Sequence, residues 1–374
     1  MTEESLAAAA LSVLNDRYLI PSVDPHYTLP ADIPLELSGE AVRARLCMFT
    51  DDRGREMAMR PDLTLPVALR EVDRRLRGEQ GFYYYIYAGR AFRLPAAPDD
   101  PLEFTQVGFE EFGLDSWTAD DVRPFYNVRL MLDACAVSPT AVVTGDLAIF
   151  PAVIDALGLP EVIRDLLKRA FRQEGGVAEL LAATPEPLDA DIAAVLDADE
   201  PETALRACLA QRNITMIGTR SEAEIIAGLR ARAEAASAGG IPAEARRVLE
   251  DFGRINCPVT MAASAVSDLA GTHSLTGLDE VIQMLYQRNA LMIDREIIDP
   301  DTATFRSGFG RRFTYYDGFV FEVLGANLTA RQPIAAGGRY NGLIRALSGG
   351  KVSSNGIGGV MRPDRVLRAL GAGA

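Results

Sequence analysis

Segments typical of β-strands lie at both ends of this chain, and a long helical block separates them. Strand-like runs occur within residues 1–148 and return after residue 254, whereas residues 149–254 repeat Ala, Leu, Glu and Arg with helical spacing. If strands from both ends of the chain belong to one sheet, the helical block is an interruption within that sheet's sequence. We therefore expect an α+β fold in which residues 1–148 and 255–374 form a mostly antiparallel sheet flanked by helices, and residues 149–254 form an inserted helical subdomain.

Shorter patterns predict the individual elements on either side of the block. Thr2 is a candidate N-cap, and Asp51-Asp52-Arg53-Gly54-Arg55 has the composition of a hairpin turn. Helices are predicted over residues 2–17, 64–75, 120–136 and 278–288, and from residue 363 onward. Strands are predicted over residues 46–50, 56–60, 82–87, 140–144, 259–261, 313–316 and 319–324, with a further strand from residue 102.

Charge and composition exclude several classes of partner. The 374-residue chain has a formal net charge of −14 and no dense run of Lys or Arg, so we expect no nucleic-acid partner, because phosphate binding needs a local cationic surface. The four cysteines form no CxxC pair, and we see no signal peptide, which indicates reduced thiols in a cytoplasmic protein. No apolar run is long enough for a bilayer, so no membrane association is expected.

The chain offers little for metal or nucleophilic chemistry. It contains only two histidines, His26 and His273, and neither has a local cluster of other ligand-type residues. A zinc site of the His/Cys kind and a catalytic triad are both disfavoured, and we predict neither a metal nor a cofactor. Surface or hydrogen-bonded structural roles are the simpler interpretation of both histidines.

Four polar residues lie on strand-like frames, and three of them, Asp62, Gln106 and Glu110, are suited to a ligand's ammonium group. Asp62 and Thr64 follow a predicted strand with one residue between them, so both can meet one ligand from a turn. Gln106 and Glu110 are an even number of residues apart, which puts both on one face of a strand. Carboxylates and amide oxygens are the acceptors that an ammonium requires.

Two arginines supply the complementary group for a carboxylate. Arg93 follows one predicted strand, and Arg311 precedes the Tyr315-Tyr316 pair. Since a guanidinium binds a carboxylate with a two-pronged fork, the whole set fits a zwitterionic amino acid. The alternative interpretation is that Arg93, Arg311 and Glu110 are ordinary strand residues paired with one another.

The segment between Arg93 and Gln106 is predicted to be the loop of a ligand-binding β-hairpin, but this loop contains no cations. Its interior contains prolines and aspartates but no Lys, Arg or His. A loop that holds ATP needs Arg or Lys to bind the phosphate oxygens. The segment therefore keeps a binding framework and lacks the chemistry for a nucleotide.

Five segments together resemble the catalytic domain of histidyl-tRNA synthetases, a class II aminoacyl-tRNA synthetase. The resemblance runs from about residue 18 to the end of the chain, and the helical middle carries no matching motif. The matching segments are RPDLT (60–64), FR (92–93) with EFTQVGFE (103–110) as motif 2, RRFTYYDGFVFE (311–322), AGGRYNGL (336–343) and GIGGVMRPDR (356–365) as motif 3.

This resemblance implies a histidine-binding pocket. The implied histidine contacts are Asp62, Thr64, Arg93, Gln106, Glu110, Arg311, Tyr315 and Tyr316, and each has a suitable residue type. The departures lie elsewhere. The motif 2 loop has Pro95, Ala96, Pro101 and Leu102 where synthetases carry Glu and Arg, and Asn341, Arg312 and Thr314 replace Asp, Gly and Asp. The chain stops after motif 3, so we expect no anticodon-binding domain.

A chain that keeps the histidine-binding residues and lacks the cations for ATP resembles the regulatory subunits of ATP phosphoribosyltransferase, which are paralogues of histidyl-tRNA synthetase. That resemblance implies a non-catalytic homodimeric core, a hetero-octamer with a short-form ATP phosphoribosyltransferase catalytic subunit, and feedback inhibition by L-histidine. A truncated synthetase-like enzyme that adenylates histidine is the alternative, which Arg93 and Arg365 keep open. A histidine sensor acting on another partner is a third interpretation.

Overall fold

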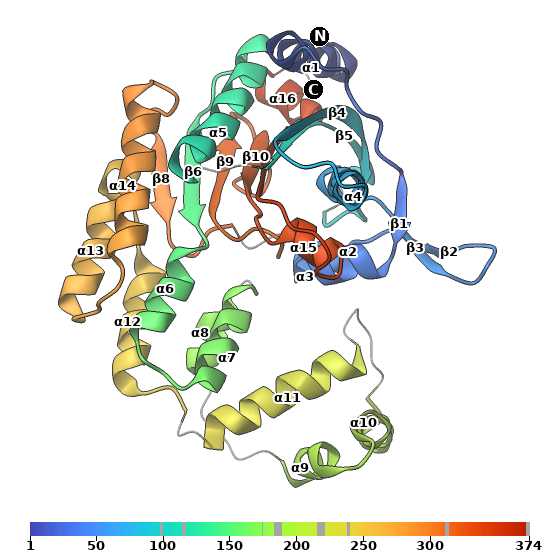
Figure 1. Cartoon of the computed structure of the whole chain (residues 1–374), viewed down its shortest axis with the longest axis vertical. Helices are drawn as coiled ribbons and strands as arrows, with labels where there is room; N and C mark the ends of the chain where they lie inside the picture. The colour runs from blue at the N-terminus through green and yellow to red at the C-terminus, as the bar shows by residue number, and fades with distance from the viewer. Residues whose placement is uncertain are drawn as a thin grey trace. The chain divides into compact units, whose positions relative to one another are not determined.

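The protein is described from a computed structural model over residues 1–97, 100–113, 117–173, 175–182, 189–214, 221–237, 240–310 and 314–371. The chain divides into two compact units. Residues 1–149 and 254–374 form the first unit, and residues 150–253 form the second. Both are shown in Figure 1.

The first unit combines helices with two sheets. Its helices are α1 (Glu3–Tyr18), α2 (Asp32–Leu37), α3 (Glu40–Arg43), α4 (Thr64–Leu76), α5 (Trp117–Ala134), α13 (Ala262–Thr272), α14 (Asp279–Asp294), α15 (Leu343–Leu347) and α16 (Pro363–Ala369). Its strands are β1 (Thr28–Pro30), β2 (Met48–Thr50), β3 (Glu56–Met59), β4 (Tyr83–Phe92), β5 (Glu103–Phe112), β6 (Ala141–Asp146), β7 (Asn256–Pro258), β8 (Ala303–Arg306), β9 (Phe319–Leu324), β10 (Ala335–Arg339) and β11 (Gly356–Met361).

Strands from both ends of the chain interleave in the larger sheet. The eight strands have the order β4-β5-β11-β10-β9-β6-β8-β7, and every neighbouring pair is antiparallel except β6 with β8. Figure 1 shows the green β6 beside the orange-red β9, although about 170 residues separate them in the sequence. A smaller sheet has the order β1-β3-β2. The predicted antiparallel-dominated α+β fold is thus confirmed.

Alternation along β4 and β5 divides the interior into two layers. Tyr84 and Ile86 belong to a core with residues of α1, α5 and α16, whereas Tyr85 and Tyr87 belong to a second core with residues of α4 and α15. Successive side chains of a strand point to opposite faces, so one strand pair serves both layers. Gln106 and Glu110 face the α4 side, as their even spacing predicts.

Several predicted elements appear where the sequence indicated. Thr2 caps α1 with a reciprocal capping box to Ser5, and the 46–60 hairpin forms β2 and β3. The strand predicted at 259–261 is wrong. Pairing with β8 ends at Pro258, and Val259 then begins a 3-10 turn whose carbonyl accepts from Asn289.

The strand predicted over 313–316 is also wrong across its described part, residues 314–316, which form a turn. Asp317 explains the difference. Its amide donates to the carbonyl of Arg339 at 3.0 Å, and its carboxylate accepts from the amides of Asn341 and Gly342 at 2.9 and 2.8 Å. These bonds tie the segment to the end of β10, so it does not extend β9.

The sequence did not predict β1, β8, β10 or β11, and the last two were missed because they are rich in glycine. In β10, a Cβ on Gly337 would lie 2.4 Å from the carbonyl oxygen of Gly358 and 2.6 Å from the ring of Phe321. In β11, a Cβ on Gly359 would lie 2.8 Å from Val128. Packing this close admits only glycine, and strand propensity counts glycine against a strand.

The described elements of the second unit are helices: α6 (Ile149–Ala156), α7 (Glu161–Phe171), α8 (Gly176–Ala182), α9 (Ala190–Asp197), α10 (Pro201–Gln211), α11 (Glu222–Ser237) and α12 (Ala243–Arg254). Phe150 of α6 stacks on Phe171 of α7 with 3.9 Å between ring centroids, and Phe252 of α12 lies 5.6 Å from Phe150. A small apolar cluster joins α9, α10 and α11. The helical spacing of the sequence predicted this content.

Four buried charges tie the first unit together. Asp121 of α5 accepts from Arg339 of β10 at 2.6 Å and from Arg288 of α14 at 3.1 Å, and Asp146 of β6 accepts from Arg288 at 2.6 Å. All four side chains are at most 1% exposed. Two guanidinium groups and two carboxylates balance, which makes their burial tolerable.

Replacing one member of this group should cost much of the stability. Asp121→Ala removes the carboxylate that both Arg339 and Arg288 donate to, and leaves their buried positive charges only partly neutralised. We expect the free energy of unfolding to fall by about 3–5 kcal/mol. Chemical denaturation measures it, with Asp268→Ala on an exposed position of α13 as the matched control, expected within about 0.5 kcal/mol of the parent. A loss below about 1 kcal/mol for Asp121→Ala would show that another group balances these arginines.

Candidate functional site

A polar cluster lies where the start of α4 meets the inner face of β5. Asp62 and Thr64 come from the α4 N-terminus, and Gln106 and Glu110 come from β5. All four are buried, with exposures of 9% or less. Pairing of Glu110 with Tyr85 on β4 and with Gly358 on β11 fixes its position in the middle of three strands.

Glu110 is the centre of this cluster. Its Oε1 accepts from the Thr64 hydroxyl at 2.7 Å and from the Tyr87 hydroxyl at 2.8 Å, and its Oε2 accepts from the Tyr340 hydroxyl. Gly358 closes the remaining side, because a Cβ there would overlap Oε2. Burial raises the pKa of Glu110 to about 7, although the three hydroxyl groups favour the ionised form.

Asp62 differs from Glu110 in how well it is satisfied. Its Oδ1 accepts from the amide of Leu65 at 3.0 Å in the first turn of α4. Its Oδ2 is buried without a hydrogen-bond partner among the described residues. Burial raises the pKa of Asp62, and the charge of Arg93 acts in the opposite direction. The Tyr315 side chain also acts on the Asp62 carboxyl and lowers its pKa. Of the two buried carboxyl groups, Asp62 is therefore the less completely satisfied among the described residues.

Gln106 and Arg93 frame the other side of the α4 N-terminus. The side-chain oxygen of Gln106 accepts from the amide of Leu63 at 3.2 Å. Arg93 donates Nε to the carbonyl of Pro61 at 2.7 Å, so both residues hold the turn that carries Asp62. Burial lowers the pKa of Arg93 to about 10, and the carboxylate of Asp62 resists that fall.

Three tyrosine rings form a wall beside Glu110. Tyr315 and Tyr316 lie 4.8 Å apart, and Tyr340 lies 5.9 and 6.1 Å from them. Burial raises the pKa of all three hydroxyl groups, and the charge of Glu110 acts in the same direction on each. The Asp317 contacts to residues 341 and 342 hold this wall together.

The structure brings together seven of the eight residues predicted to bind a ligand, namely Asp62, Thr64, Arg93, Gln106, Glu110, Tyr315 and Tyr316. Arg311, the eighth, lies outside the described residues. Sequence reasoning missed Tyr87 and Tyr340. Tyr87 shares a face of β4 with Tyr85, and Tyr340 lies within AGGRYNGL, so both carried a usable signal.

Arg362 was missed as well. Its guanidinium lies 3.6 Å from the centroid of Phe104, and it holds Asp364 through two bonds of 2.8 and 2.7 Å. Arg365, which sequence comparison matched to the motif 3 arginine, donates instead to the carbonyl of Pro333 at 2.9 Å. The segment between Arg93 and Gln106 lacks cations in its interior, but the fold supplies Arg362 from the start of α16.

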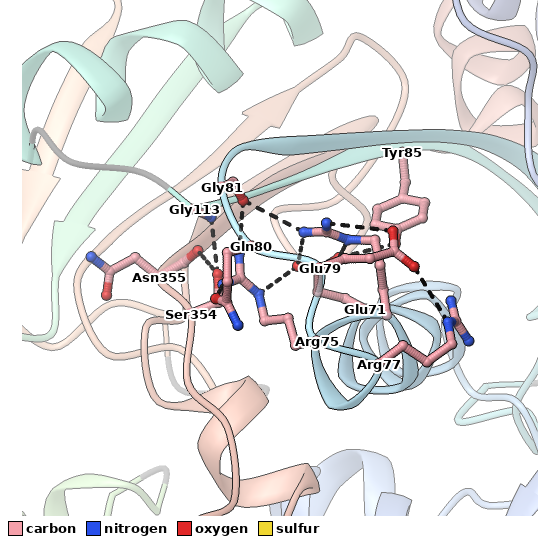
Figure 2. A network of polar contacts seen from close by, with 11 residues as sticks. Glu71, Arg75, Arg77, Glu79, Gln80, Gly81, Tyr85, Gly113, Ser354 and Asn355 are labelled. Carbon is pink, nitrogen blue, oxygen red and sulfur yellow. Dashed lines mark hydrogen bonds and ion pairs between the residues drawn. The ribbon is translucent and has the colours of Figure 1, made fainter.

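A second polar network fixes α4 against the sheet. The Glu71 carboxylate, fully buried, accepts from Arg74 at 2.7 and 2.8 Å, from Arg75 at 2.6 Å and from the Tyr85 hydroxyl at 3.0 Å. Figure 2 shows Arg75 reaching the carbonyl of Gly81 in the turn before β4. The network joins the end of α4 to β4, which stabilises the helix that carries Asp62 and Thr64 at its start.

The described ranges contain no group of three or more His, Cys, Asp or Glu residues arranged to hold a metal ion. No helix within them combines the length and apolarity needed to span a bilayer.

Solved structures similar to this chain include histidyl-tRNA synthetases and a relative of them. An ATP phosphoribosyltransferase regulatory subunit/histidyl-tRNA synthetase from Bacillus halodurans superimposes with a TM-score of 0.65 at 16% identity, covering 98% of this chain and 78% of that one. A histidine–tRNA ligase subunit from Alicyclobacillus acidocaldarius gives a TM-score of 0.61 at 22% identity, covering 99% and 93%. The fold is therefore that of a class II aminoacyl-tRNA synthetase of the histidyl type.

Relatives in sequence identify a smaller group of proteins within this fold class. The family model described as histidyl-tRNA synthetase matches residues 30–214 and 219–366. ATP phosphoribosyltransferase regulatory subunits from Chelativorans sp. and Rhizobium meliloti are each 30% identical to this chain, with coverage of 98% of both chains in the first case and of 94% of this chain and 93% of the relative in the second. The chain belongs to the histidyl-tRNA synthetase family, within its group of ATP phosphoribosyltransferase regulatory subunits.

The titration of Glu110 should appear in the stability of the protein. Its pKa is raised from 4.5 to about 7, so the protonated carboxyl favours the folded state. That contribution is fully present below pH 4.5 and is lost as pH rises through about 7. Glu110→Gln should remove up to about 3 kcal/mol of this pH dependence, measured as the free energy of unfolding from pH 4.5 to 8. Exposed Glu280→Gln is the control, and equal slopes in parent and Glu110→Gln would contradict the assignment.

Proposed function

We propose that the chain is a non-catalytic regulatory subunit of ATP phosphoribosyltransferase, the first step of L-histidine biosynthesis, and that it binds L-histidine at the α4–β5 site. The observation that carries the proposal is the buried Oδ2 of Asp62, which has no hydrogen-bond partner among the described residues. A buried acceptor without a donor costs free energy, and a ligand's ammonium would remove that cost.

The remaining groups are suited to the rest of an amino acid. The charge of Arg93 lowers the pKa of Asp62, so its guanidinium acts on the same part of the site. A guanidinium is the group that binds a carboxylate most specifically. Glu110 has a pKa of about 7, close to the ordinary value of about 6.5 for an imidazole, so the two can share a proton near neutral pH. The tyrosine wall supplies flat apolar surface for a ring.

Regulation requires that histidine bind two states of a complex with different affinities, since equal affinity would not change the populations of the two states. A coupling of about 1–3 kcal/mol is sufficient for ordinary feedback. The names of the relatives support a partner of the phosphoribosyltransferase kind. We propose a short-form catalytic subunit as that partner, in a cytoplasmic hetero-octamer built around a homodimer of this chain, with residues 149–254 as an inserted subdomain.

The first test uses the partner. The chain alone should show no phosphoribosyl transfer, because transfer is assigned to the catalytic subunit. Adding it to a short-form catalytic subunit should raise turnover and make that turnover sensitive to histidine. Steady-state rates are measured with and without the chain and with and without histidine. Unchanged rates and unchanged histidine sensitivity would exclude the proposal.

The second test concerns the binding site. Glu110→Ala and Asp62→Asn each remove a charged acceptor, so we expect histidine affinity to fall by about tenfold or more in titration calorimetry. Exposed Glu280→Ala and Asp268→Asn are matched controls that should bind as the parent does. Folding of each variant is checked by circular dichroism. Parent-like affinity in both site variants would mean that histidine binds elsewhere in the complex.

A specific observation keeps the adenylating enzyme as a second candidate. Arg93 and Arg362 both lie beside Phe104 at the base of the hairpin, so cations are present near the site although the interior of the segment between Arg93 and Gln106 has none. Histidine-dependent exchange between ATP and pyrophosphate distinguishes the two functions. Robust exchange by the chain alone would favour the enzyme.

A further inference from the structure

A cavity of about 200 Å³ lies within the first unit, in the core that packs with α5. Its walls come from α5, β6 and β9, which are labelled in Figure 1, and from the segments that follow α5 and α14. Six of its apolar lining residues, each at most 5% exposed, are Leu132, Val137, Val142, Ile297, Ile298 and Val323. The α4–β5 site belongs to the other core, and none of its described residues lines this cavity.

The floor of the cavity is suited to an apolar group. An apolar cavity of about 150 Å³ is enough to hold one benzene ring. Side chains that border empty space lose van der Waals contacts, and a ligand of matching shape restores them. The volume and the lining therefore fit a single six-membered ring or an aliphatic group of similar size.

The rim of the cavity contains one carboxylate without an ion pair. Asp299 accepts from the amide of Asp301 at 3.0 Å and from the hydroxyl of Thr302 at 3.2 Å, and it forms no ion pair within the described residues. The other charged residues of the lining, Arg129 and Asp133, pair with each other at 3.0 Å. One negative charge of the lining therefore remains, and it lies on Asp299.

Two helix C-termini add to the negative potential at the rim. α5 ends at Ala134 and α14 ends at Asp294, and the cavity is lined by the last turn of α5 and by Ile297 and Ile298, shortly after α14. Neither last turn contains a basic residue, and Arg295, the residue after α14, does not line the cavity. The C-terminal end of a helix carries a partial negative charge, which favours a cation.

We propose that this cavity is a binding site for a small organic cation, with a compact apolar body against the floor and a primary ammonium at Asp299. The body leaves water, whereas the ammonium stays at the rim and keeps part of its hydration, which avoids the cost of burying a charge. The site is separate from the one proposed for histidine and does not depend on the proposed function.

The experiment titrates the full chain with benzylamine and with benzyl alcohol, its uncharged counterpart, at neutral pH. Binding is followed by ligand-observed NMR. We expect both to bind and benzylamine to bind about threefold more tightly, because an ion pair at an exposed rim contributes only modestly. Asp299→Asn should remove this preference. Asp301→Asn is the matched control, an exposed carboxylate two positions away that does not line the cavity, and it should keep the preference.

A second variant tests the cavity itself. Val137→Phe extends into the cavity from the segment between α5 and β6 and should abolish binding of both compounds. Val137→Leu replaces it if circular dichroism shows that the phenylalanine variant does not fold, and it should weaken both. Saturating L-histidine should not displace benzylamine. The proposal is overturned if neither compound binds, if both bind equally, if the preference survives Asp299→Asn, if the folded Val137 variant binds as the parent does, or if L-histidine displaces benzylamine.

Discussion

The burial of four balanced charges is the constraint on which the first unit depends. Asp121, Asp146, Arg288 and Arg339 come from a helix, a strand, a second helix and another strand, and none has access to water. Such a group is tolerable only when every member is paired. The positions of α5, β6, α14 and β10 are therefore coupled, and the N-terminal and C-terminal parts of the chain must meet in one register.

This coupling extends to the candidate site through two adjacent residues. Arg339, the last residue of β10, is held by Asp121, and the next residue, Tyr340, donates its hydroxyl to Glu110. Neighbouring side chains on an extended backbone point to opposite sides. One segment thus contributes an ion pair to the α5 layer and a hydroxyl to the α4 layer. The alignment of Glu110 with Gly358 adds a second restraint, since only glycine leaves room for the carboxylate.

The groups around the site differ in how completely the chain satisfies them. Glu110 has three hydroxyl donors, and Arg362 has a carboxylate on its fork. Within the part of the chain that the structure describes, Oδ2 of Asp62 is buried without a hydrogen-bond partner. The proposed binding of an amino acid's ammonium group depends on this difference.

The sequence alone predicted which side chains of single strands and turns lie together in the candidate site, and that the sheet carrying them is mostly antiparallel. Even spacing put Gln106 and Glu110 on one face, and a single intervening residue put Asp62 and Thr64 on one turn, because strand and turn geometry fix such short-range relations. Only the tertiary structure brought Tyr87, Tyr340 and Arg362 to these residues. Their contacts span up to about 260 positions and depend on strand order, and the glycine-rich strands that set this order have no side-chain pattern to reveal them.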